Sequence, residues 1–156
     1  MIEKMQAVCA FFFNSPKRNG ALSAIVKEKH KTSDRRKVLL DLCRTRWSAR
    51  HEAYNHFYKA YVALVEVLEV MSQGLHHENY ETIRSTCSDW DSKTKTDACS
   101  LLHAITDFSF LVTFMLVHKY LSHLHGVTVL LQKTSLDVLE AYEMVYNFLN
   151  ILSTKF

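Results

Sequence analysis

Apolar residues recur along this chain every three or four positions, the spacing that places side chains on one face of an α-helix. The clearest stripe has steps of 3, 4, 3, 4 and 3 residues and consists of Tyr54, Phe57, Tyr61, Leu64, Leu68 and Met71. We therefore predict a long helix that starts at a cap on Thr45 or Ser48, reaches about Met71 and is terminated by Gly74.

Two helices are predicted to precede it. Residues 2–13 are apolar enough for a buried helix. Ser15 and Pro16 suit the cap and the first position of a second helix that reaches about His30, with Leu22, Ile25 and Val26 on its inner face. Because the chain opens at Met1 with an apolar helix already under way, we expect further sequence upstream, with a genuine short start as the alternative.

The stretch from Asp97 to about His125 is apolar almost all round. Its apolar residues include Leu101, Leu102, Ile105, Phe108, Leu111, Val112, Met115, Leu116, Tyr120, Leu121 and Leu124. Such a helix is predicted to lie at the centre of a bundle, with Gly126 marking a break. Residues 134–137 then suit the cap of a last helix. Its stripe consists of Val138, Tyr142, Val145, Leu149 and Leu152.

Polar segments at residues 27–44 and 75–96 are predicted to be loops, the second with room for a short helix near residues 79–86. Trp90, in the second segment, is expected to anchor its loop to the body of the protein. Glycine (3) and proline (1) are too scarce for the many turns of an all-β fold. The prediction is an all-α, irregular bundle with two long helices, formed by residues 1–156 as a single helical region.

The net charge of +3 is distributed unevenly along the chain. Residues 1–60 contain 13 Lys and Arg against 5 Asp and Glu, a balance of +8, and residues 61–156 contain 6 against 11, a balance of −5. A basic surface for an acidic partner and an ordinary solvated polar face both fit this split. The basic run within residues 27–37 fits either a solvated linker or a nuclear-import signal.

The four cysteines, Cys9, Cys43, Cys87 and Cys99, form no C-x-x-C pair and no disulfide framework, which favours reduced thiols in an intracellular protein. The most apolar stretch, residues 108–117, is too short to span a bilayer. Residues 5–13 lack a following cleavage site for secretion. We expect no membrane partner and no secretion.

Residues 42–53 contain a recognisable motif, with Cys43, Thr45, Arg46, Trp47 and Arg50 in the order C-x-T-R-W-x-x-R-x-x-A. This segment resembles the signature of hAT-superfamily transposases and of their domesticated relatives, the zinc finger MYM-type and THAP-domain proteins. Three further segments, at residues 12–18, 98–112 and 130–138, resemble companion motifs of the same family in the same order. The resemblance covers roughly residues 8–156.

The resemblance implies that the chain corresponds mostly to the helical insertion of a ribonuclease-H-like transposase. In the family, two catalytic aspartates and a C-x-x-H motif lie upstream of this segment, and the catalytic glutamate and dimerisation region lie downstream. None of these motifs occurs in the present sequence. Nuclear localisation is the family expectation, and cytoplasmic localisation is the alternative.

Trp47 is the residue that the family comparison singles out. In active members the matching tryptophan contacts DNA, and an indole can replace lost base stacking at about 1–3 kcal/mol. Arg46 and Arg50, and more weakly Arg44, are candidate phosphate contacts beside it. The alternative is that Trp47 anchors the start of the long helix while both arginines are solvated.

Two further cations, Lys17 and Arg18, are predicted in the first turn of a helix, where the helix dipole disfavours positive charge. They are therefore candidates for a phosphate partner, with ordinary exposed cations as the alternative.

Catalytic chemistry has little support in the sequence. Seven aspartates are scattered over predicted loops and helix starts, without strands to bring three carboxylates together around metal ions. The nine histidines show no zinc-finger spacing. His103 and Asp107 are expected to form a structural polar pair rather than a ligand pair, and Cys43 a buried hydrophobe rather than a nucleophile.

We therefore expect a non-enzymatic, transposase-derived module without cofactor or small-molecule substrate, which binds a protein partner or a second copy of itself. The alternative is nucleic-acid binding through the basic first third of the chain and the T-R-W motif.

Overall fold

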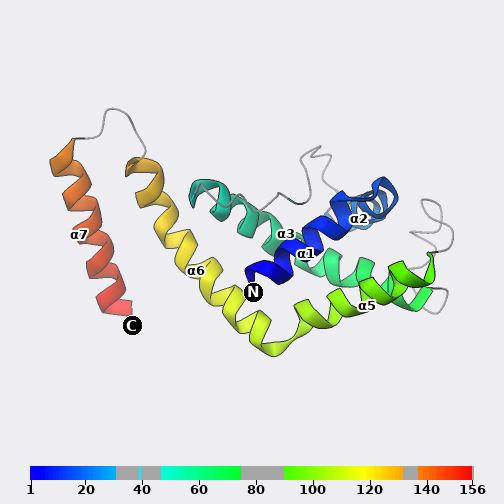
Figure 1. Cartoon of the computed structure of the whole chain (residues 1–156). Coiled ribbons are helices and arrows are strands. Elements are labelled where there is room, and N and C mark those ends of the chain that lie inside the picture. The colour runs from blue at the N-terminus through cyan, green and yellow to red at the C-terminus, as the bar shows by residue number, and fades with distance from the viewer. Residues whose placement is uncertain (31–38, 40–46, 75–89, 132–136, 156) are drawn as a thin grey trace.

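The computed structural model describes residues 1–30, 39, 47–74, 90–131 and 137–155, apart from some side chains near helix ends. Within these ranges the chain forms six α-helices and no strand, which confirms the all-α prediction. The helices are α1 (Ile2–Phe13), α2 (Pro16–His30), α3 (Trp47–Gln73), α5 (Ser92–Thr106), α6 (Phe108–Leu131) and α7 (Val138–Lys155). α1, α2, α3 and α5 gather into a body, from which α6 leads to α7 at the far end (Figure 1).

α1 and α2 form as the pattern predicts. Met5 and Phe12 of α1 are fully buried, and so is Leu22 on the inner face of α2. Ser15 caps α2, since its Oγ accepts a long hydrogen bond of 3.4 Å from the backbone N–H of Arg18. Pro16 takes the first helical position, where a missing N–H costs nothing.

α3 is the centre of the body and packs against α2, α5 and α6. The predicted stripe is buried, except that Tyr61 is half-buried. The helix already begins at Trp47, so Ser48 lies inside it and is not its cap, while Thr45 lies outside the described residues. Gly74 follows the last residue of α3 with φ +62°, a left-handed conformation that glycine adopts without strain and that ends the helix as predicted.

The prediction of one helix from Asp97 to His125 is wrong. The chain instead forms two helices, α5 and α6, with a bend of 61° between them. Asp107 lies between them in an extended conformation, with φ −59° and ψ 133°. Its carboxylate accepts a hydrogen bond from the backbone N–H of Phe110, so it caps α6. The apolar pattern continues through the bend because α5 and α6 both pack on α3, α5 along its second half and α6 along its first.

The prediction that this apolar stretch lies at the centre of the bundle is also wrong for α6. Phe110 and Phe114 are buried against α3, but Phe108 is 79% exposed and Met115 and Leu116 are each 49% exposed. Gly126 does not break α6, which runs on to Leu131. α6 therefore has one apolar face covered by α3 and a second one open to solvent.

α7 begins at Val138, directly after Asp137, whose Oδ1 accepts a hydrogen bond of 3.4 Å from the backbone N–H of Leu139. The predicted cap is thus confirmed at Asp137, and the rest of residues 134–137 lies outside the description. α7 contacts α6, yet Val138 is 84% exposed and Tyr142 67% exposed.

The two loop predictions are partly wrong within the residues that the structure describes. α2 continues through residues 27–30, and α5 starts at Ser92, inside the segment 75–96. Asp91 explains the earlier start, since it caps α5 by accepting a hydrogen bond from the backbone N–H of Thr94. The suggested short helix at residues 79–86 lies outside the described residues, as does Cys43.

No single described helix is long and apolar enough to cross a membrane, although α5 and the first part of α6 pass this test of length and composition together as a bent pair.

Candidate interaction surfaces

The first turn of α2 places two of the predicted cations on aromatic rings. Nζ of Lys17 lies 4.7 Å from the ring centre of Trp90, and Cζ of Arg18 lies 4.2 Å from that of Phe11. Such contacts contribute about 0.5–1 kcal/mol at exposed sites. They offset the unfavourable position of Lys17 and Arg18 at the positive end of a helix dipole. These contacts within the chain therefore explain how both cations are accommodated in the first turn of α2.

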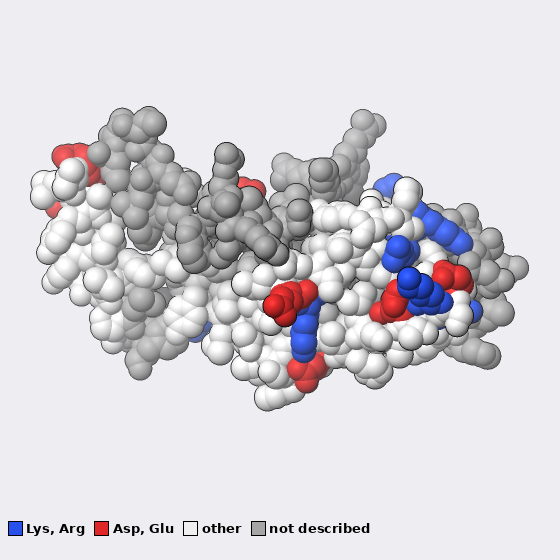
Figure 2. Space-filling view, viewed as in Figure 1, with Lys and Arg blue, Asp and Glu red and all other residues white. Residues whose placement is uncertain are grey.

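Trp90 anchors the start of α5 to the body, as predicted, since its side chain is only 6% exposed. The cap residue Asp91 follows it directly. The hydrogen bonds from Thr94, first from its side chain and then from its backbone, hold the pKa of Asp91 below its ordinary value. On the face of the molecule seen in Figure 2, acidic and basic side chains of the described residues lie close together.

The T-R-W motif lies at the N-terminal end of α3. Trp47 is the first residue of the helix and Arg50 lies in its first turn, but their side chains are outside the described part of the structure. Arg44 and Arg46 lie outside it entirely. Of the six candidate nucleic-acid contacts, the structure therefore places only the side chains of Lys17 and Arg18, and nucleic-acid binding stays a prediction.

An aromatic cluster joins α6 to the first half of α3. The buried ring of Phe114 lies 5.5 Å from the ring of Phe57, 5.7 Å from that of Phe110 and 5.9 Å from that of Tyr54, measured between ring centres. Offset and edge-to-face aromatic pairs contribute about 0.5–1.5 kcal/mol each beyond their buried area. Phe114 is therefore the main anchor of α6.

Three histidines continue this contact toward the N-terminal end of α3. The rings of His51 and His125 stack at 4.1 Å with an angle of 18° between their planes. The ring of His118 stacks on Tyr58 at 4.4 Å and 14°. We call His51, His118 and His125 the histidine seam.

Two histidines of the seam, His51 and His118, favour the neutral form. Burial lowers the pKa of His51 most, the nearby His125 and His118 lower it further, and Glu52 opposes them. Burial also lowers the pKa of His118. In each histidine of the seam one ring nitrogen is shielded from solvent and has no hydrogen-bond partner among the described residues.

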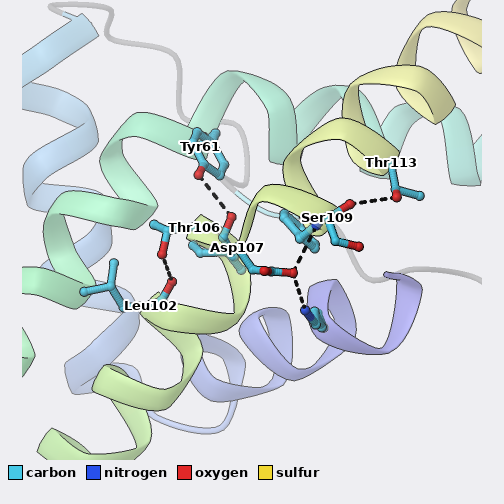
Figure 3. A network of polar contacts seen from close by, with 9 residues as sticks. Tyr61, Leu102, Thr106, Asp107, Ser109 and Thr113 are labelled. Carbon is cyan, nitrogen blue, oxygen red and sulfur yellow. Dashed lines mark hydrogen bonds and ion pairs between the residues drawn. The ribbon is translucent and has the colours of Figure 1, made fainter.

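A polar network holds the bend between α5 and α6 (Figure 3). Oδ2 of Asp107 accepts hydrogen bonds from the backbone N–H of Phe110 at 3.3 Å and from Nζ of Lys4 at 3.4 Å. The hydroxyl of Tyr61 donates to the carbonyl of Ile105 at 3.1 Å, and burial raises the pKa of this hydroxyl, which keeps it protonated. The predicted side-chain pair of His103 and Asp107 is wrong, because this carboxylate turns to α6 and α1 instead.

α7 carries apolar residues on two sides. Ala141, Met144 and Phe148 are half-buried and lie at intervals of three and four, the side that packs on α6. At 100° per residue, a second stripe lies about 120° from the first. Its exposed members, which we call the α7 outer face, are Val138, Leu139, Tyr142, Val145, Tyr146 and Leu149.

The described aspartates act as helix caps or lie at the surface. Asp91, Asp107 and Asp137 each accept a backbone hydrogen bond at a helix start, and Asp97 is exposed. Among the described residues, no group of three His, Cys, Asp or Glu side chains is arranged to hold a metal ion.

Sequence reasoning missed both the histidine seam and the α7 outer face. His118 and His125 are seven residues apart, which places them on one side of α6, and this spacing was the available signal. The stacking partner His51 is distant in sequence, and no local pattern indicates it. The stripe of α7 was predicted, but its spacing does not tell whether the stripe is covered.

Two curated proteins are similar to this chain. The "52 kDa repressor of the inhibitor of the protein kinase" of Homo sapiens is 30% identical over 136 residues, and its counterpart in Mus musculus is 27% identical over 135 residues. Each alignment covers 86% of this chain but only 16% of the relative, so the chain spans a small part of the proteins it matches.

No protein-family model matches the chain. No solved structure matches it either. The chain is thus a distant relative of one segment of these repressors.

Proposed function

We propose that this chain is a non-catalytic, transposase-derived helical module that binds a protein partner through the α7 outer face. The observation that carries the proposal is the exposure of that face, where Tyr142 is 67% and Leu149 56% exposed. Apolar side chains gathered in one exposed stripe are typical of interaction sites. The exposed side of α6, with Met115 and Leu116, adds to the apolar surface of this part of the molecule.

The occupant that fits is an amphipathic helix of another protein, with an apolar stripe bordered by Lys or Arg. A helix that lays its apolar face on such a surface is recognised by anchors three and four residues apart, the spacing on α7. The described acidic residues on and before α7 are Asp137, Glu140 and Glu143, and the sequence of residues 137–150 contains no Lys or Arg. Basic borders on the partner would therefore complement this surface.

The likeness to the curated repressors supports a protein as the partner. Their name describes repression of the inhibitor of a protein kinase, and only the expectation of a protein target is transferred to this chain. The hAT-like motifs at Trp47 and its companions support a transposase origin and a nuclear location.

A non-catalytic role is supported by the described aspartates. Asp91, Asp107 and Asp137 stabilise helix starts, and they come from separate elements rather than from one convergent site. Nucleic-acid binding through Arg46, Trp47 and Arg50 is the alternative.

A binding experiment with two synthetic helices tests the proposal. Both peptides carry a leucine stripe, one with lysines at its borders and the other with glutamates. We expect the lysine peptide to bind and the double variant Tyr142→Lys/Leu149→Lys to bind it at least about tenfold more weakly, since a charge on each anchor disrupts the apolar contact. The matched control Asn147→Lys adds a cation at an exposed α7 position outside the outer face and should stay within about twofold of wild type.

Equal binding of both peptides, or equal losses in the double variant and the control, would reject the α7 outer face as the site. Sedimentation that shows a stable dimer, disrupted by the same double variant, would reject a foreign helix as the occupant in favour of a second copy.

A further inference from the structure

The histidine seam lies in the contact between α3 and the second half of α6. α6 meets the first half of α3 through the ring of Phe114, and beyond it the contact is continued by His118 on Tyr58 and His51 on His125. α7 follows α6 in the chain and contacts it. Val117 and Leu121 also pack against the core here, so the position of the second half of α6, and of α7 with it, depends in part on stacked imidazole rings.

This arrangement suits neutral rings only. Nδ1 of His51, Nε2 of His118 and Nδ1 of His125 are shielded from solvent and have no hydrogen-bond partner in the described part of the chain. A protonated imidazole carries a donor on both nitrogens, so each of these positions would then hold a charged donor without an acceptor. Protons on both rings of the 4.1 Å stack would also repel each other.

We propose that the histidine seam is a pH-sensitive latch, in which proton uptake releases the second half of α6, together with α7, from α3. This inference is independent of the proposed function, because it rests on the contact between α3 and α6. Release would uncover the apolar surface around Phe114 and Tyr54 that is buried in the closed state.

Among the described residues, the groups that shift the pKa of His51 belong to α3 and α6. From α3, Glu52 favours the proton on His51, and Tyr58 contributes a neutral ring. From α6, His118 and His125 oppose it. No described group of α7 contributes to the lowered pKa of His51 or His118. The exposed carboxylate of Glu52 therefore raises the pKa of His51, whereas burial and the two imidazoles lower it.

The direction of the pH effect follows from the lowered pKa values of His51 and His118. Well above pH 6.5 both histidines are neutral in the closed and the open state, and the latch has its full stability. As the pH falls below 6.5, the open state takes up protons first, so closure weakens. Each histidine lowers the equilibrium constant for closure by at most tenfold per pH unit. This effect ends once the pH falls below the pKa of that histidine in the closed state.

Hydrogen–deuterium exchange of the 156-residue chain at pH 7.5 and pH 5.5, corrected for intrinsic exchange rates, tests the latch. We expect residues 115–126 of α6 to lose at least about threefold more protection than α5 on acidification. The triple variant His51→Gln/His118→Gln/His125→Gln should show no such difference between pH values. The control His103→Gln removes an exposed histidine on α5 and should behave as wild type.

Equal changes in α5 and α6 of the wild-type chain would overturn the proposal, and so would a triple variant that keeps the pH response. If the triple variant does not fold, the imidazole resonances of the wild-type chain decide the matter by NMR titration. Titration of His51 and His118 at the ordinary value near 6.5 would then reject the latch.

Discussion

Replacement of Asp107 by alanine is the most direct test of how the bend between α5 and α6 is made. The carboxylate contributes a helix cap to α6, which is worth about 1 kcal/mol, and an ion pair with Lys4. The side chains of this pair are 40% and 47% exposed, so solvent screening reduces it to about 0.5 kcal/mol or less. The free energy of unfolding should therefore fall by about 1–1.5 kcal/mol in Asp107→Ala.

Urea unfolding followed by circular dichroism measures this change. With a slope of about 2 kcal/mol per molar urea, a loss of 1–1.5 kcal/mol lowers the midpoint by about 0.5–0.7 M. Asp107→Asn separates the two contributions, because asparagine caps a helix about as well as aspartate but forms no ion pair with Lys4. We expect Asp107→Asn and Lys4→Met each to cost about 0.5 kcal/mol or less.

Equal losses in the alanine and asparagine variants would refute the capping argument, since the charge alone would then account for the effect. A change below about 0.3 kcal/mol in Asp107→Ala would refute it too, and would mean that packing on α3 makes the bend without the cap.

Three further predictions concern α6, α3 and the T-R-W motif. Phe114→Ala removes a buried ring with several aromatic neighbours and should cost about 3–5 kcal/mol in urea unfolding, whereas Phe114→Leu should cost clearly less. Gly74→Ala should cost about 1 kcal/mol because φ is +62° there, although no atom lies within 4 Å of the added Cβ. If the chain binds nucleic acid, replacing Arg46, Trp47 and Arg50 by alanine should weaken binding to a hairpin DNA and flatten its salt dependence in a filter-binding assay.

Each of these predictions has a result that contradicts it. A loss below about 1 kcal/mol in Phe114→Ala would mean that α6 is not anchored through this ring. Gly74→Ala at wild-type stability would mean that the end of α3 adopts another conformation in solution. Hairpin affinity that is unchanged by the triple alanine variant would exclude the T-R-W motif as the contact.

The sequence predicted the helices whose ends are marked by local chemistry. Ser15 and Pro16 mark the start of α2, and Gly74 marks the end of α3. The bend at Asp107 was missed because α5 and α6 cover consecutive parts of α3, so the apolar spacing continues across it. Asp107 and Asp91 were not predicted as caps, because a single aspartate is equally compatible with an exposed helical position.

The candidate site was predicted less completely than the fold. Lys17 and Arg18 were correctly placed in the first turn of α2, but their aromatic partners Trp90 and Phe11 are set by tertiary packing. The histidine seam joins residues 51 and 125, which no local pattern connects. Helix periodicity identifies which side chains share a face and says nothing of what packs on that face.

α6 shows the difference between an apolar side that is covered and one that is exposed. Phe110, Phe114 and Val117 follow one side of the helix at steps of four and three, and α3 covers that side. Phe108, Val112 and Met115 follow another side with the same steps and remain exposed. An apolar side that stays in contact with water is unfavourable, and covering it would stabilise the helix. The exposed side of α6 and the α7 outer face therefore both support the proposal that a partner packs against the last two helices.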